Sequence, residues 1–115
     1  MADKVYDLAQ LEELAGGSQE FIMSMVDTFL EHTPGQVEQI DQAHKSGDLT
    51  TVGGIAHKIK PNIDLFGISV LTGTIREIEQ MGKAGEDSPK LADLIAELLS
   101  VTKVAFKQLE DLKNA

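Results

Sequence analysis

Apolar residues recur every three or four positions along almost the whole chain, with polar residues between them. This spacing matches the 3.6-residue period of an amphipathic helix, and no segment alternates strictly as a half-buried strand would. Each helix would then turn one apolar face toward a shared core. The pattern therefore predicts an all-α fold.

Glycine, proline and capping residues divide this pattern into six predicted helices. The first, over residues 7–15, ends at a pair of glycines, and Ser18 is well placed to cap the second. Pro34 disfavours helical geometry in the residue before it, so we expect the second helix to stop there and a third to begin. His32 would then lie at a helix end, where a partly cationic ring interacts favourably with exposed carbonyls.

The second half of the chain contains the other three predicted helices. Asp48 is a suitable cap for a helix over residues 49–66, and the next helix starts near Ser69 and gives way to a loop over residues 82–87. Ser88 followed by proline indicates a cap and a first helical position for the last helix. The set predicts a four-helix bundle with additional short helices, and residues 1–115 have the length of a single domain.

Composition and charge exclude several classes of function. Ten Lys and Arg against nineteen Asp and Glu give a net charge of -9, which would repel a nucleic acid. The absence of cysteine excludes a thiolate metal site, and the three histidines lack metal-ligand spacing, so we expect no bound metal. There is no secretion signal and no apolar run long enough to span a bilayer, so we expect a cytoplasmic protein.

The helix predicted over residues 49–66 holds the candidate chemistry. A helical wheel gathers its apolar residues into one stripe: Val52, Ile55, Ala56, Ile59, Ile63 and Phe66. His57 lies roughly 140° from the centre of this stripe, with Lys60 at about 80° and Asp64 at about 120°. The imidazole of His57 is therefore expected to point toward solvent.

Three residues that disfavour a helix surround His57 on this wheel. Gly53 and Gly54 each cost roughly 1 kcal/mol relative to alanine, which indicates either close packing or an approaching partner. Pro61 costs about 3 kcal/mol and lacks the N–H that would bond to the carbonyl of His57. Because the apolar stripe stays in phase across the proline, we predict one kinked helix. All three residues should leave the imidazole clear of bulky neighbours.

The segment Ala56-His57-Lys58-Ile59-Lys60, followed by Gly67, resembles the signature of the histidine-containing phosphotransfer (HPt) domain family. The resemblance extends over most of the chain and includes Gly47-Asp48 before the signature and Ile78-Glu79 after it. It implies an antiparallel four-helix bundle with additional short N-terminal helices.

The resemblance also implies roles for individual residues. His57 would accept and donate a phosphoryl group, Lys60 would lie beside that group, and Gly67 would be a packing position. Glu79 occupies a position where these domains often place a polar residue near the imidazole. Pro61 departs from the family pattern, which more often has glycine there, and this affects local hydrogen bonding rather than accessibility.

A neutral imidazole nitrogen is a good nucleophile near pH 7, and a lysine one turn away would stabilise the transferring anion. Glu79 or a water could accept the other ring N–H. No nucleotide-binding motif accompanies the histidine, so we expect a phosphocarrier without ATP-dependent kinase activity. Two alternatives stay open: a histidine-centred acid-base enzyme, and a non-catalytic helical adaptor that binds a signalling protein.

The resemblance implies the partners as well. They would be receiver domains of a hybrid sensor kinase and of response regulators, and they would meet the exposed rim around His57. Magnesium is expected only in the partner receiver, with no cofactor in this chain. The size of the chain suggests a monomer.

Overall fold

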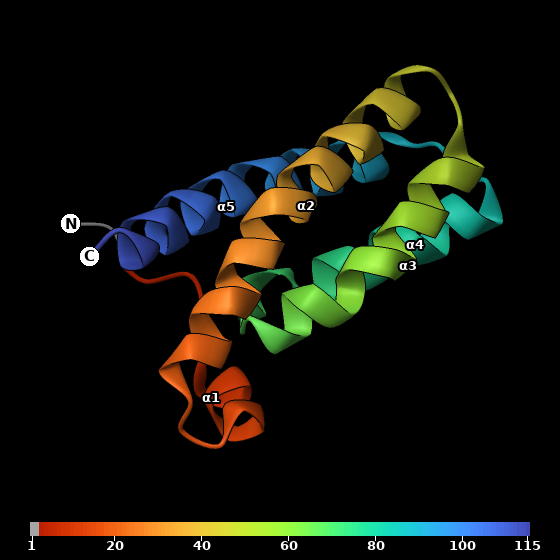
Figure 1. Cartoon of the computed structure of the whole chain (residues 1–115). Helices are drawn as coiled ribbons and strands as arrows, with labels where there is room; N and C mark the ends of the chain where they lie inside the picture. The colour runs from red at the N-terminus through yellow and green to blue at the C-terminus, as the bar shows by residue number, and fades with distance from the viewer. Residues whose placement is uncertain (1–2) are drawn as a thin grey trace.

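The computed structural model describes residues 3–115 and confirms the all-α prediction, with no strand in that range (Figure 1). The elements are α1 (Ala9–Ala15), α2 (Gln19–Lys45), α3 (Leu49–Leu65), the 3₁₀ turn η1 (Ser69–Leu71), α4 (Thr72–Ala84) and α5 (Pro89–Lys113). Among these residues, none of the helices combines the length and the apolar character needed to cross a membrane.

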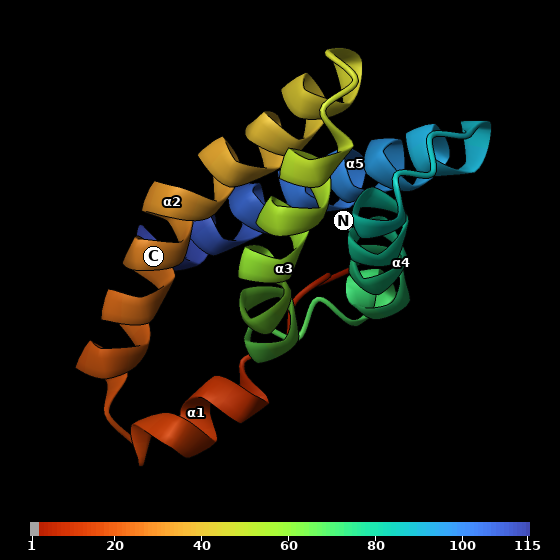
Figure 2. The same ribbon diagram turned by 90° about the vertical axis from the view of Figure 1, so that its right-hand side faces the viewer.

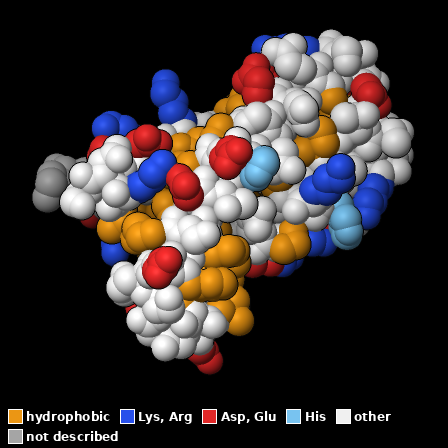
Figure 3. All heavy atoms as spheres, in the orientation of Figure 1, with side chains coloured by type: hydrophobic (Ala, Val, Ile, Leu, Met, Phe, Trp, Pro, Cys, Tyr) orange, Lys and Arg blue, Asp and Glu red, His pale blue; other side chains and the backbone are white. Residues whose placement is uncertain are grey.

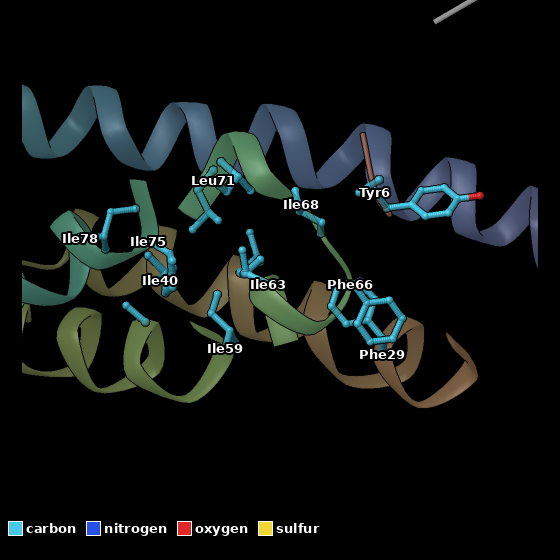
Figure 4. Close-up of a cluster of buried hydrophobic side chains, with 14 of the residues drawn as sticks. Tyr6, Phe29, Ile40, Ile59, Ile63, Phe66, Ile68, Leu71, Ile75 and Ile78 are labelled. Carbon is cyan, nitrogen blue, oxygen red and sulfur yellow. The ribbon is translucent and has the colours of Figure 1, made fainter. Parts of the chain in front are cut away.

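The helices pack around one aliphatic core. The most extensive packing joins α3 to α4, while α2 contacts both α3 and α5. Figure 2 shows α3 and α4 side by side, with the short α1 lying below the start of α2. Ten of the buried side chains are labelled in Figure 4: Tyr6, Phe29, Ile40, Ile59, Ile63, Phe66, Ile68, Leu71, Ile75 and Ile78. At one end of this core the ring of Phe29 stacks on that of Phe66, with centroids 4.2 Å apart.

All three predicted N-cap residues stand at the starts of their helices, and two of them cap through the side chain. The side chains of Ser18 and Asp48 each accept a hydrogen bond from the backbone N–H three residues further on, at 3.1 and 3.2 Å. Pro89 occupies the first turn of α5 as expected, but the side chain of Ser88 makes no capping hydrogen bond within residues 3–115. Ser88 is therefore the N-cap residue of α5 by position, as predicted.

The predicted break at Pro34 is also wrong, because α2 continues through it as a single helix of 27 residues. The proline removes one backbone hydrogen bond, to the carbonyl of Leu30. Phe29 before it and Val37 after it are both buried on the core face, so tertiary packing holds the helix in phase. His32 consequently lies inside α2 rather than at a helix end. The predicted third helix is part of α2, so α1 is the one short helix in the first half of the described chain.

The predicted loop over residues 82–87 begins too early. Helix α4 continues to Ala84, and Gly85 ends it in the left-handed conformation at φ 70°. Gly82 is buried inside the helix, where its backbone packs against Gly53 of α3. Gly82, which the sequence suggested as the end of a helix, thus permits a close contact between α3 and α4 because it has no side chain. The other predicted boundaries agree with the structure to within three residues.

Candidate functional site

His57 projects from the middle of α3 with its side chain 60% exposed. Its neighbours Ala56 and Ile59 are completely buried on the opposite face, which confirms the orientation predicted from the helical wheel. The helix also runs through Pro61 without interruption, as predicted. This continuity keeps His57 and Lys60 one turn apart on the same helix.

One nitrogen of the His57 ring is held by a carboxylate. Nδ1 lies 2.7 Å from Oε2 of Glu79 on α4. Because an ionised carboxylate only accepts hydrogen bonds, Nδ1 donates its N–H to Glu79. In the neutral ring this leaves the lone pair on Nε2, the nitrogen that faces away from Glu79. The predicted placement of Glu79 near the imidazole is therefore what the structure shows.

Glu79 is itself fixed by two lysines. Lys60 donates to Oε1 at 2.7 Å, and Lys83 donates to Oε2 at 2.8 Å. The hydrogen bond from Lys60, followed by those from Lys83 and His57, lowers the pKa of Glu79 from 4.5 to about 2, although burial acts in the opposite direction. The carboxylate, whose side chain is 11% exposed, is thus ionised at neutral pH.

Lys60 lies next to the histidine, as expected, and it is bonded to Glu79. Lys83 was not identified from the sequence, although its spacing of four residues from Glu79 is typical of an ion pair along a helix. Figure 3 shows Lys and Arg side chains gathered on the part of the surface formed by α3 and α4. The site is therefore locally cationic in a chain whose net charge is -9.

The two adjacent glycines of α3 lie in different environments. A Cβ atom on Gly53 would lie 2.9 Å from the backbone nitrogen of Lys83. A Cβ atom on Gly82 would lie 2.5 Å from the backbone nitrogen of Gly53. For Gly53, the structure therefore favours close packing over the approach of a partner. Gly54 is exposed, and no described residue lies within 4 Å of where its Cβ would be.

Asp64 lies further along α3, about 10 Å from His57 at 1.5 Å per residue, and Gly67 lies beyond the end of that helix. Asp64 accepts two hydrogen bonds from Arg76 of α4, at 3.1 and 2.6 Å. Gly67 follows the end of α3 with φ 60°, and a side chain there would collide with the backbone of Asp7. Both residues fix the end of the helix and do not contact the imidazole.

A shallow hollow of about 500 Å³ lies between α1 and α3 on the side of Pro61. It is lined by Gln10, Glu13, Leu14, Pro61, Asp64 and Leu65. Leu14 is 68% exposed there, and Pro61 is one turn from His57. The periodicity of α1 gave no indication of this hollow, because it forms only where α1 packs near the end of α3.

Comparisons with known proteins agree with this description. The family model described as "Hpt domain" matches residues 24–114. The crystal structure of histidine-containing phosphotransfer protein B (HptB) from Pseudomonas aeruginosa PAO1 superimposes with a TM-score of 0.83 at 18% identity, covering 98% of this chain and 97% of that one. At this identity the likeness shows a shared fold. No curated protein matches the sequence. The match over residues 24–114 shows that the chain belongs to the Hpt domain family.

Proposed function

We propose that this protein is a phosphorelay intermediate that receives a phosphoryl group from a receiver-domain aspartate on His57 and passes it to another receiver domain. Hpt domains are histidine phosphocarriers and not kinases. The observation that carries the assignment to His57 is its ring geometry. The imidazole is exposed, Nδ1 is held by Glu79, and Nε2 is available as the nucleophile.

In the proposed step, the lone pair of Nε2 attacks the phosphorus of the aspartyl phosphate in line. The bond from phosphorus to the aspartyl oxygen breaks, and its electron pair leaves with the receiver carboxylate. The ring becomes a cationic phosphoimidazole, whose Nδ1–H remains bonded to Glu79. The negative charge of Glu79 stabilises this cation. The reverse of these steps would deliver the group to a second receiver.

Lys60 is proposed to stabilise the negative charge of the transferring group. It lies three residues after His57 and is bonded to Glu79, with its side chain 27% exposed. Phosphoryl transfer depends mainly on positioning and on charge stabilisation, and a cation one turn from the nucleophile supplies the second. Magnesium is proposed to be bound by the carboxylates of the receiver, and this chain would need no cofactor.

We further propose that receivers of a hybrid sensor kinase and of response regulators dock on the exposed rim around His57. The hollow beside Pro61 supports this location, because it begins at Pro61, one turn from the histidine, extends to the exposed Leu14 and is partly apolar. A monomer would leave this rim free. Short connections between α2, α3, α4 and α5 favour neighbouring helices that run antiparallel, which supports the predicted four-helix bundle.

The test is transfer from a phosphorylated receiver domain to the wild-type chain and to His57→Gln. We expect phosphate that is stable in base and labile in acid on the wild type alone. Circular dichroism of the variant would establish that it is folded. Label on the folded variant would exclude His57 as the acceptor. Receiver binding without label on the wild type would favour the helical adaptor.

A further inference from the structure

The two oxygens of Glu79 have different partners. Oε1 accepts from Lys60 of α3, at 2.7 Å. Oε2 accepts from Lys83 of α4, at 2.8 Å, and the same oxygen accepts Nδ1–H of His57. Lys83 therefore holds the oxygen that orients the imidazole, whereas Lys60 holds the other one.

The close contact between α3 and α4 sets the position of Lys83. The backbone nitrogen of Lys83 lies 2.9 Å, and its Cγ 3.1 Å, from where a Cβ atom on Gly53 would be. Gly53 is four residues before His57, so the stem of Lys83 lies against α3 one turn before the histidine. Lys60 approaches Glu79 from three residues after the histidine. The two lysines thus reach the carboxylate from opposite ends of the site.

On the basis of the proposed phosphotransfer function, we propose that Lys83 is a positioning residue for His57. Lys83 fixes Oε2 of Glu79 against Nδ1, so that Lys60 can leave Oε1 and bind the phosphoryl group on Nε2. No covalent bond changes in this exchange, since Lys60 replaces one anionic partner with another. Glu79 keeps one cation and the ring N–H throughout.

The charges in the site account for the need for two lysines. Glu79, Lys60 and Lys83 together carry one net positive charge. This charge would offset part of the negative charge of a bound phosphoryl group, which is about −1.5 to −2. If Lys60 were the sole cation on Glu79, its movement to the phosphoryl group would leave a largely buried carboxylate without a lysine partner. Removing one partner of such a pair is strongly destabilising. Lys83 removes this obstacle.

The ring tautomer of His57 gives a test that requires no transfer. Nitrogen-15 NMR of the unphosphorylated full chain, recorded where the imidazole is neutral, should show the proton on Nδ1 in the wild type. In Lys83→Met we expect this preference to fall at least about threefold toward the mixture of tautomers of free histidine, because Oε2 is no longer fixed. Lys83→Arg should restore it.

Lys60→Met is the matched variant on the other oxygen. It should keep the wild-type tautomer, because Lys83 still holds Oε2, while transfer from a phosphorylated receiver slows. Lys58→Met removes an exposed charge next to His57 and should leave the tautomer unchanged. An unchanged tautomer in Lys83→Met, or an equal change in Lys58→Met, would overturn the role of Lys83. Absence of label on the wild type would instead overturn the proposed function, since the tautomer measurement is independent of transfer.

Discussion

The two sides of α3 differ sharply. On the side that faces α4, Gly53 touches the backbone of Gly82, and Glu79 accepts hydrogen bonds from three side chains. On the other side, Pro61 is exposed and no described residue comes within 4 Å of a Cβ on Gly54. One helix therefore separates two requirements of a phosphoryl carrier. The closed side orients the imidazole, and the open side leaves it accessible.

The strongest way to break the closed side is Gly82→Ala. The new methyl group would lie 2.5 Å from the backbone nitrogen of Gly53 and 3.0 Å from the carbonyl oxygen of Leu49. Neither backbone atom can rotate away, so α3 and α4 must move apart. We expect a loss of roughly 1–3 kcal/mol in the free energy of unfolding, measured with urea. Stability equal to that of the wild type would show that the two helices are not in close contact.

The next effect comes from the charge of Glu79. At pH 7, Glu79→Gln should lower the free energy of unfolding by roughly 1–2 kcal/mol, because three charge-assisted hydrogen bonds weaken. The pKa of Glu79 is lowered from 4.5 to about 2, so folding favours the ionised carboxylate. This contribution is complete above about pH 4.5 and is lost as the pH falls toward about 2.

The wild type should therefore lose stability more steeply than Glu79→Gln between these two pH values. Urea unfolding of both proteins across this window measures the difference, and the other carboxylates affect both proteins alike. Parallel curves for the two proteins would mean that Glu79 is not stabilised by its lysines in the folded state.

The closed and open sides also differ in how far the sequence could predict them. The apolar stripe of α3 was sufficient to predict that His57 is exposed, because helical periodicity is a local property. Pro34 and Gly82 were misjudged, since a local preference against helix is outweighed by packing that depends on other helices. Lys83 was missed for a related reason. Its spacing from Glu79 is visible in the sequence, but its place beside His57 depends on how α3 and α4 cross.

Lys60, which is bonded to Glu79 on the closed side and lies one turn from His57, is tested by the effect of Lys60→Ala on the rate of phosphoryl transfer. Transfer from a phosphorylated receiver should slow by about tenfold, which corresponds to about 1.4 kcal/mol of transition-state stabilisation. The free energy of unfolding should change by less than about 1 kcal/mol, because the side chain is partly exposed and Lys83 still pairs with Glu79. An unchanged transfer rate would remove Lys60 from the mechanism. Rapid-quench measurements with a single receiver give the rate directly.

The smallest effect on the fold is expected on the open side, from Gly54→Ala. Since no described residue would meet the new methyl group, the helix preference of alanine should raise the free energy of unfolding by up to about 1 kcal/mol. This is the opposite sign to Gly82→Ala, and a loss of stability would mean that Gly54 packs as Gly53 does. A larger side chain in Gly54→Gln should preserve the fold and the tautomer of His57 but slow transfer. That combination would show that the open side is kept free for the receiver, because only the approach of a partner would then be obstructed.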